Sequence, residues 1–318
     1  MFMVMTLHLG ISTSPDKFIA GGVYISAIAI PLFFLVSGWL MIDKPIGGGY
    51  LIRKIGRIFR FVTIISLIGA VCSFWIPMLN YEGIGWGLKK IILIIINPYL
   101  QKGIFSVFWY LGAMIVIYAL LPIFNLAYRK YGLIGLYFIA VCLFIIECFV
   151  FQLNVLYNFE ERFVLQAFRI WNWLFYFIMG AIIKRRFSKN NLTIGWGLPI
   201  SLAFLYVLYA HMIIPLVHTW EYLYASPMCM LYSIIVFVYI VNIKISNKIL
   251  IKIISFFSNL FLPVYALHII ILLCLRNMPN IGLGIIKPEV YLFLVWFITI
   301  IISWIIIKIP IVRSIFRI

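Results

Sequence analysis

Long apolar runs alternate along this chain with short polar stretches, most of them basic. A helix needs about 20 residues to cross a bilayer, and ten runs approach or reach that length: residues 1–11, 22–42, 61–79, 108–125, 133–151, 166–183, 195–213, 225–242, 254–274 and 290–307. Backbone polar groups must pair within the chain in lipid. The pattern therefore predicts an all-α, polytopic membrane bundle of about ten helices, with a single domain over residues 1–318 and no soluble domain.

Two stretches depart from this pattern. The first run offers only MFMVMTLHLGI before the polar STSPDK, about half a crossing, and it lacks the charged start and cleavage site of a signal peptide. We therefore expect that part of the first helix is missing before Met1. Residues 88–100, LKKIILIIINPYL, are too short to cross and contain Pro98, so an interfacial or re-entrant segment is expected.

Composition supports a membrane protein. The chain is 66% hydrophobic and 10% charged, with a mean hydropathy of +1.17, well beyond soluble domains. A net charge of +17 could suit nucleic acid, but the basic residues lie in short stretches between apolar runs. That placement is typical of orientation in a membrane, so no nucleic-acid partner is expected.

The distribution of charge predicts an orientation. Seventeen of the 25 basic residues fall in residues 43–60, 126–132, 184–194, 243–253 and the C-terminal stretch, while most acidic residues fall on the opposite side of the predicted spans. Positively charged loops face the cytoplasm. The sequence thus predicts a multi-pass protein of the cell membrane with both termini in the cytoplasm. Frequent Ile, Lys and Asn are typical of a low-GC bacterial genome.

Ionisable residues inside apolar runs are candidates for chemistry. His8 lies in the first run. An imidazole titrates near neutral pH and can take a proton from a hydroxyl, so His8 is a candidate general base. The alternative is a solvated histidine at a helix end.

A basic cluster follows the second run. In RKIGRIFR, a helix would place Arg53, Arg57 and Arg60 on one face, at i, i+4 and i+7. Guanidinium groups suit bidentate contacts to phosphate, although an ordinary positive-inside anchor has the same composition. The glycines at 47–49 are not followed by Lys-Ser/Thr, which argues against an ATP-driven transporter.

Further polar and aromatic residues could line a cavity. Trp109 and Tyr110 open the fourth run, where interfacial aromatic residues are also common. Glu147, in the fifth run, could pair with Arg169 as a structural tie or form a cavity wall. Arg169, Asn172 and Tyr176 would share one face of the sixth run, at i, i+3 and i+7.

Two more candidates lie in the second and ninth runs. Tyr265 and His268 share a face after Pro263, and a packing histidine is the alternative there. Ser37 is the one hydroxyl in FFLVSGWLM, and either close helix packing or a nucleophile would explain it. Cys and His spacing predicts no metal site.

Several segments together resemble acyltransferase family 3, whose members acylate sugars and other envelope molecules. They are VMTLH, PLFFLVSGWLM, RKIGRIFR, FWYLGAMIVIYALLP and FLPVYALHIIIL, in this order over nearly the whole chain. The family pattern also has an Arg upstream of the first-span His, at a position that would precede Met1.

The resemblance implies an O-acetyltransferase type of enzyme. Acyl-CoA, usually acetyl-CoA, would be a donor substrate binding from the cytoplasm through Arg53, Arg57 and Arg60, with no permanently bound cofactor. His8 would be the base or a transient acyl carrier, and Ser37-Gly38 a packing step. The outer ends of spans four to six would receive an envelope glycan or lipid-linked sugar, with Tyr265 and His268 lining the same cavity.

Two other functions remain open from the sequence. A transporter or flippase of a lipid-linked sugar would use a similar polar cavity, and inverted repeats would favour it, although none is evident. A structural partner subunit of an envelope complex is the second alternative. Acyl transfer by the isolated protein would exclude both.

Overall fold

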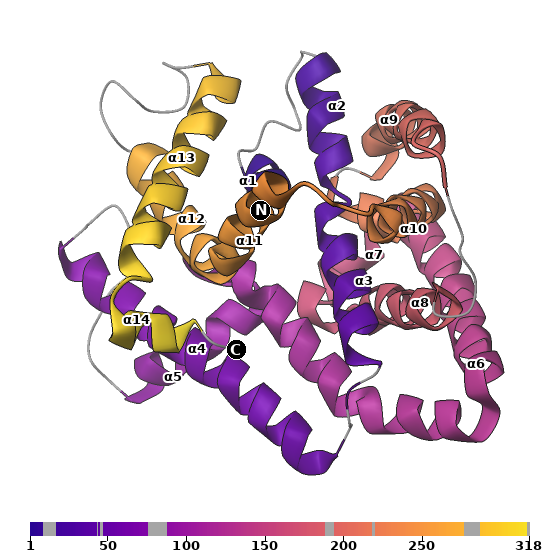
Figure 1. Ribbon diagram of the computed structural model, residues 1–318, viewed down its shortest axis with the longest axis horizontal. Coiled ribbons are helices and arrows are strands. Elements are labelled where there is room, and N and C mark those ends of the chain that lie inside the picture. The colour runs from indigo at the N-terminus through magenta and orange to yellow at the C-terminus, as the bar shows by residue number, and fades with distance from the viewer. Residues whose placement is uncertain are drawn as a thin grey trace. The chain divides into compact units, whose positions relative to one another are not determined.

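The computed structural model describes residues 1–8, 17–42, 44, 47–75, 88–187, 194–217, 220–276 and 287–316. Within these ranges the regular structure is helical throughout and includes no strand, which confirms the all-α prediction there (Figure 1). Among the residues that the structure describes, five helices are long and apolar enough to cross a membrane, or six if one bent pair counts as a single span. The chain is therefore an integral membrane protein with several spans.

The helices fall into two compact units. Unit 1 contains residues 1–9, 48–115 and 245–318, and unit 2 contains residues 10–47 and 116–244. Both units are assembled from separated parts of the sequence, so contacts between distant segments define each of them.

Unit 1 contains the first helix and the C-terminal helices. Its elements are α1 (Phe2–His8), α4 (Gly48–Trp75), α5 (Leu88–Ile96), η3 (Asn97–Leu100), η4 (Ser106–Phe108), the start of α6 (Trp109–Tyr157), α11 (Lys248–Asn259), α12 (Phe261–Arg276), α13 (Pro288–Ile306) and α14 (Pro310–Ile315). Helices α12 and α13 pack along each other, and α1 contacts both (Figure 1). The short α1 is thus held against the C-terminal part of the chain.

Unit 2 contains the remaining helices. Its elements are α2 (Lys17–Ser26), α3 (Ala29–Met41), the rest of α6, α7 (Phe159–Phe163), η5 (Gln166–Phe168), α8 (Ile170–Phe187), α9 (Gly197–Val217), η6 (Trp220–Ala225) and α10 (Pro227–Asn242). Helix α3 packs along α8, while α10 contacts α3, α8 and α9. The stacked rings of Phe34 and Trp173, with centroids 5.0 Å apart, lie within the α3–α8 contact.

Two glycines allow α3 and α8 to touch backbone to backbone. A Cβ added at Gly38 would lie 1.8 Å from the carbonyl oxygen of Phe177, and one at Gly180 would lie 2.0 Å from that of Leu35. Small residues permit such close approach of membrane helices. The close packing predicted at the Ser37-Gly38 step is therefore confirmed for Gly38, and α8 supplies a reciprocal glycine.

One predicted boundary lies inside α6. At Gly132 the backbone leaves the helical conformation, with φ 62° and ψ −145°. Glycine adopts positive φ without the steric cost of a Cβ. This break separates the runs predicted at 108–125 and 133–151, so α6 consists of two helical segments.

Other boundaries were predicted wrongly. The span predicted to begin at residue 61 is part of a longer helix, because α4 begins at Gly48 and carries the basic cluster on the same helix as the apolar run. The run at 254–274 is not one straight span, because α11 and α12 meet near Leu260 with a bend of 58°. Pro263 has no N–H to donate to the carbonyl of Asn259, which interrupts the hydrogen-bond ladder between the two helices.

Residues 88–100 form only the short α5 and η3, consistent with a segment too short to cross.

Candidate active site

A row of rings in unit 1 brings four predicted site residues together. The imidazoles of His8 and His268 have centroids 5.4 Å apart. Tyr265 lies 6.1 Å from His268 by the same measure, and Tyr110 lies 6.4 Å from Tyr265. Helices α1, α12 and α6 supply these side chains, so residues at opposite ends of the sequence meet in one cluster.

His268 is held in a defined orientation by its own helix. Its Nδ1 lies 2.8 Å from the carbonyl oxygen of Tyr265 and 3.2 Å from that of Val264. Carbonyl oxygens only accept hydrogen bonds, so Nδ1 carries the hydrogen and Nε2 of the neutral ring is an acceptor. His268 is 1% exposed, and its Nε2 has no hydrogen-bond partner in the described part of the chain.

Tyr265 is fixed by a bond to another helix. Its hydroxyl donates to the carbonyl oxygen of Val107, just before α6, and its ring packs on Phe108 with centroids 5.5 Å apart. Tyr110 is half-buried and Trp109 is buried at the start of α6. The tyrosine hydroxyl therefore anchors the wall of the cluster.

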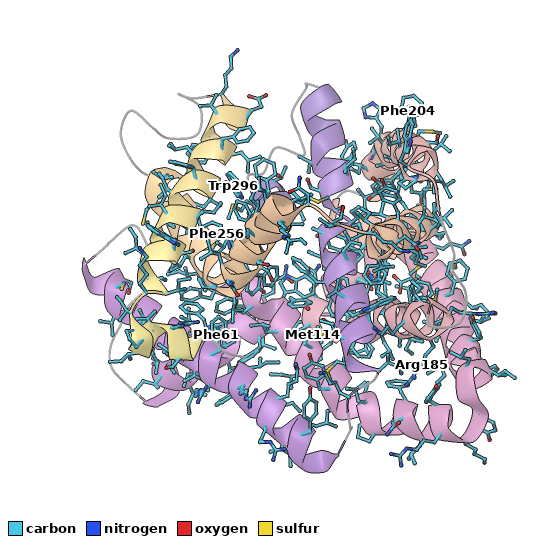
Figure 2. The ribbon with its side chains drawn as sticks, in the orientation of Figure 1. Phe61, Met114, Arg185, Phe204, Phe256 and Trp296 are labelled. Atoms are coloured by element: carbon cyan, nitrogen blue, oxygen red, sulfur yellow. The ribbon has the colours of Figure 1, made fainter. Side chains whose placement is uncertain are left out.

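The arginine row belongs to the same unit. Arg53, Arg57 and Arg60 are exposed in the first part of α4, where the helical spacing places them on one face along about 10 Å of axis. Phe61, labelled in Figure 2, follows Arg60, is 1% exposed and packs on Phe108 with centroids 5.6 Å apart. Because Phe108 also packs on Tyr265, buried rings connect this helix to the histidine pair.

Unit 2 holds a second polar cluster, built around Glu160. One carboxylate oxygen of Glu160 accepts from Nδ2 of Asn154 at 2.7 Å, and the other accepts from the indole of Trp171 at 3.0 Å. The backbone N–H of Glu160 donates back to Asn154, and Arg169 approaches the carboxylate at 3.8 Å. Burial raises the pKa of Glu160, while Arg169 and the two donors oppose that shift.

This arrangement corrects two predictions about Arg169. Arg169 lies before α8, not on it, with φ −72° and ψ 58°, so it does not share a helix face with Asn172 and Tyr176. Its ion pair is with Glu160 rather than Glu147. Asn154 and Trp171, which complete the cluster, were not predicted as site residues, although FEERF is an unusually charged stretch in this apolar chain.

Glu147 is placed differently. It is fully buried, and neither carboxylate oxygen has a hydrogen-bond partner among the described residues. The charges of Glu160 and Arg169 affect the ionisation of the Glu147 carboxyl group. The charge of Glu147 in turn affects the ionisation of the Tyr176 hydroxyl. The Oδ1 of Asn172 is likewise buried without a partner in the described structure. This part of unit 2 therefore offers hydrogen-bond acceptors to a donor-rich group.

Ser37 lies on α3, half-buried, beside the glycine contact with α8. A small, mostly apolar pocket adjoins that contact and is lined by Gly38, Leu121, Phe177 and Ala181 together with neighbouring side chains. Within the described ranges, no three His, Cys, Asp or Glu side chains are grouped as metal ligands would be.

Comparison with known protein families assigns the chain to a family. The profile of the acyltransferase domain matches residues 1–308, nearly the whole chain. The chain belongs to acyltransferase family 3. The resemblance expected from the sequence is thus confirmed, and the protein is a membrane acyltransferase of this family. The matched range contains both histidines of the ring cluster and the arginine row. No curated protein and no solved structure matches the chain.

Proposed function

We propose that this acyltransferase moves an acyl group, acetyl by family default, from cytoplasmic acyl-CoA to a hydroxyl of an envelope sugar or polysaccharide. The contact between His8 and His268 carries the proposal, since it places a half-buried and a fully buried imidazole in one ring cluster. The same unit presents three exposed guanidinium groups on α4. A base and an anion-binding row are the two parts that such a transfer requires.

His8 acts as the general base in this proposal. The hydroxyl oxygen of the acceptor attacks the thioester carbonyl carbon while His8 takes the hydroxyl proton. The new C–O bond forms, the C–S bond breaks, and the proton passes from His8 to the sulfur of the leaving CoA thiolate. A transient acyl group on His8 is the alternative route, and it would leave label on the protein when the acceptor is omitted.

The arginine row binds the phosphates of the donor. Arg53, Arg57 and Arg60 are exposed and follow one helix face, as phosphate contacts require. In the proposed topology both termini and this end of α4 face the cytoplasm, where acyl-CoA is present. Ten spans fit this topology. They are the candidate spans given above, with the bent pair counted as one span and α6 counted as two because of the break at Gly132, together with α1, α8 and α10.

Unit 2, taken by itself, offers candidate contacts for a sugar in this proposal. The unpartnered oxygens of Glu147 and Asn172 are acceptors that sugar hydroxyls could satisfy. Arg169 is a further candidate within unit 2. Trp109 and Tyr110 are candidates within unit 1, where the ring of Tyr110 contacts that of Tyr265. Ser37 is assigned to packing beside Gly38 and not to covalent chemistry.

Transfer of label from acetyl-CoA to envelope glycan tests the proposal. Membranes carrying the protein are compared with membranes carrying His8→Ala or Arg57→Ala, and Arg129→Ala is the control because Arg129 is an exposed basic residue on α6. We expect transfer to be lost in His8→Ala, reduced in Arg57→Ala and unchanged in the control. Absence of transfer to every glycan offered to the unmutated protein would favour transport of a lipid-linked sugar instead.

A further inference from the structure

The two ring nitrogens of His268 differ in hydrogen bonding within the described structure. Its Nδ1 bonds to the carbonyl oxygens of Tyr265 and Val264. Its Nε2 is buried and has no hydrogen-bond partner among the described residues. A buried acceptor without a donor is unfavourable unless a partner reaches it during function.

His8 is the side chain best placed to be that partner. Its ring centroid is 5.4 Å from that of His268, with planes inclined by 39°. A small rotation of His8 would bring an N–H to Nε2 at the usual hydrogen-bond length of about 3 Å. The nearby hydroxyl of Tyr265 is unavailable, because it donates to Val107.

Other titratable groups around His268 do not take this role. The amino group of Met1, one residue before α1, acts on His268 through its charge, as His8 does, and Nε2 accepts no hydrogen bond from it or from any other described residue. Tyr291, on the neighbouring helix α13, donates its hydroxyl to the carbonyl oxygen of Leu272. Tyr110 contacts the ring of Tyr265.

We propose that His268 is a positioning residue for His8, whose N–H donates to Nε2 of His268. This inference rests on the proposed function, in which His8 is the base. The bond selects one tautomer of His8. In that tautomer the other ring nitrogen has no hydrogen and can take the proton from the sugar hydroxyl. When His8 has taken that proton, it carries two N–H groups, and His268 stabilises the cation by accepting one of them. His268 itself gains no proton, and the proton on His8 leaves with the CoA sulfur.

Two substitutions separate the two nitrogens of His268. The amide of Asn reaches only as far as Nδ1, whereas the amide of Gln reaches the position of Nε2. We expect His268→Gln to keep the rate of acyl transfer within a few-fold of the unmutated protein. His268→Asn should lower kcat roughly 10- to 100-fold, the range for partners that orient a functional histidine. The KM for acyl-CoA should change little in both variants.

The pH profile distinguishes positioning from a merely structural role. Stabilisation of protonated His8 by His268 places the acidic limb of the kcat profile at higher pH than in a protein without that acceptor. The acidic limb should therefore move to lower pH in His268→Asn and stay in place in His268→Gln. Loss of folded protein would lower the amplitude without moving the limb.

A second readout does not depend on activity. The chain has four histidines, so nitrogen-15 NMR of histidine-labelled protein can follow each ring, with His8→Ala assigning the signal of His8. We expect His8 to titrate at lower pH in His268→Asn than in the unmutated protein and His268→Gln. Identical His8 titration in all three would overturn the inference, even if acyl transfer were observed. Failure of the unmutated protein to transfer would contradict the proposed function and leave this comparison readable.

Discussion

Glu160 in unit 2 and His268 in unit 1 are both about 1% exposed, yet they are bonded very differently. Both oxygens of Glu160 accept hydrogen bonds, from Asn154 and from Trp171, and Arg169 lies nearby. In His268 the helix backbone fixes one nitrogen, and the other has no partner in the described structure. The difference separates a polar group that holds the fold from one that is held ready for a partner.

This contrast gives a criterion for the other buried polar residues. A satisfied group contributes to stability, and its loss leaves its donors unpaired. An unsatisfied group contributes little to stability, and its loss should appear in function. By this criterion Glu147 belongs with His268, and Asn154 belongs with Glu160. The following substitutions test the division.

Replacement of His8 should have the largest effect on activity. We expect His8→Ala to lower the rate of acyl transfer by about 10²- to 10⁴-fold, the usual contribution of a general base. The melting temperature of the detergent-solubilised protein should stay close to that of the unmutated protein, because His8 forms no hydrogen bond within the part of the chain that the structure describes. Transfer at more than half the original rate would remove His8 from the mechanism.

Replacement of Glu160 should affect stability most. We expect Glu160→Leu to lower the free energy of unfolding by about 3 kcal/mol, because buried Asn154 and half-buried Trp171 would lose their acceptor and buried Arg169 would lose its ion pair with Glu160. Thermal unfolding measures this change. Glu289→Gln is the control, since Glu289 is an exposed acidic residue on α13. Equal melting temperatures for the two variants would mean that the Glu160 cluster does not stabilise the fold.

The arginine row tests a third kind of group, charged and exposed. Arg57→Ala should raise the KM for acyl-CoA about tenfold while kcat changes little, because one charge-assisted contact to phosphate is lost. The effect should shrink as salt is added, since exposed charges are screened. Steady-state rates at two ionic strengths provide the measurement. A lower kcat with unchanged KM would assign Arg57 to another role.

The smallest expected effect comes from a matched pair of tyrosines. Tyr265 donates to Val107 and Tyr291 donates to Leu272, so Tyr265→Phe and Tyr291→Phe each lose one hydroxyl-to-carbonyl bond. Both should lose about 1 kcal/mol of stability. Only Tyr265→Phe should also slow acyl transfer, by a few-fold, because Tyr265 adjoins His268. Equal rates in the two variants would show that Tyr265 acts only in packing.

The sequence predicted the helical class and the close packing at Gly38 because their signals are local. Apolar runs identify membrane helices directly, and the glycine in FFLVSGWLM indicated close packing before any partner was known. The i, i+4, i+7 spacing of the arginines also depends on one helix alone. Each of these features is encoded within a few turns of chain.

The remaining features depend on distant contacts or on backbone detail. No local pattern pairs His8 with His268, or Gly38 with Gly180, because the partners lie far apart in sequence. Helical periodicity misplaces Arg169, because the residues just before it form η5 and Arg169 itself is not helical. The bend near Leu260 could have been anticipated from Pro263, whose missing N–H marks the first turn of a helix.

The contact between α3 and α8 also constrains the order in which the protein can be assembled. Leu35 and Gly38 are synthesised long before Phe177 and Gly180, by on the order of ten seconds at ordinary translation rates. During that interval the surface of α3 around Leu35 and Gly38 cannot pack against α8, so lipid or the insertion machinery must cover it. Helix α8 therefore packs onto a surface of α3 that is already in the membrane. If synthesis is stalled before residue 170, this surface of α3 should be accessible to crosslinkers.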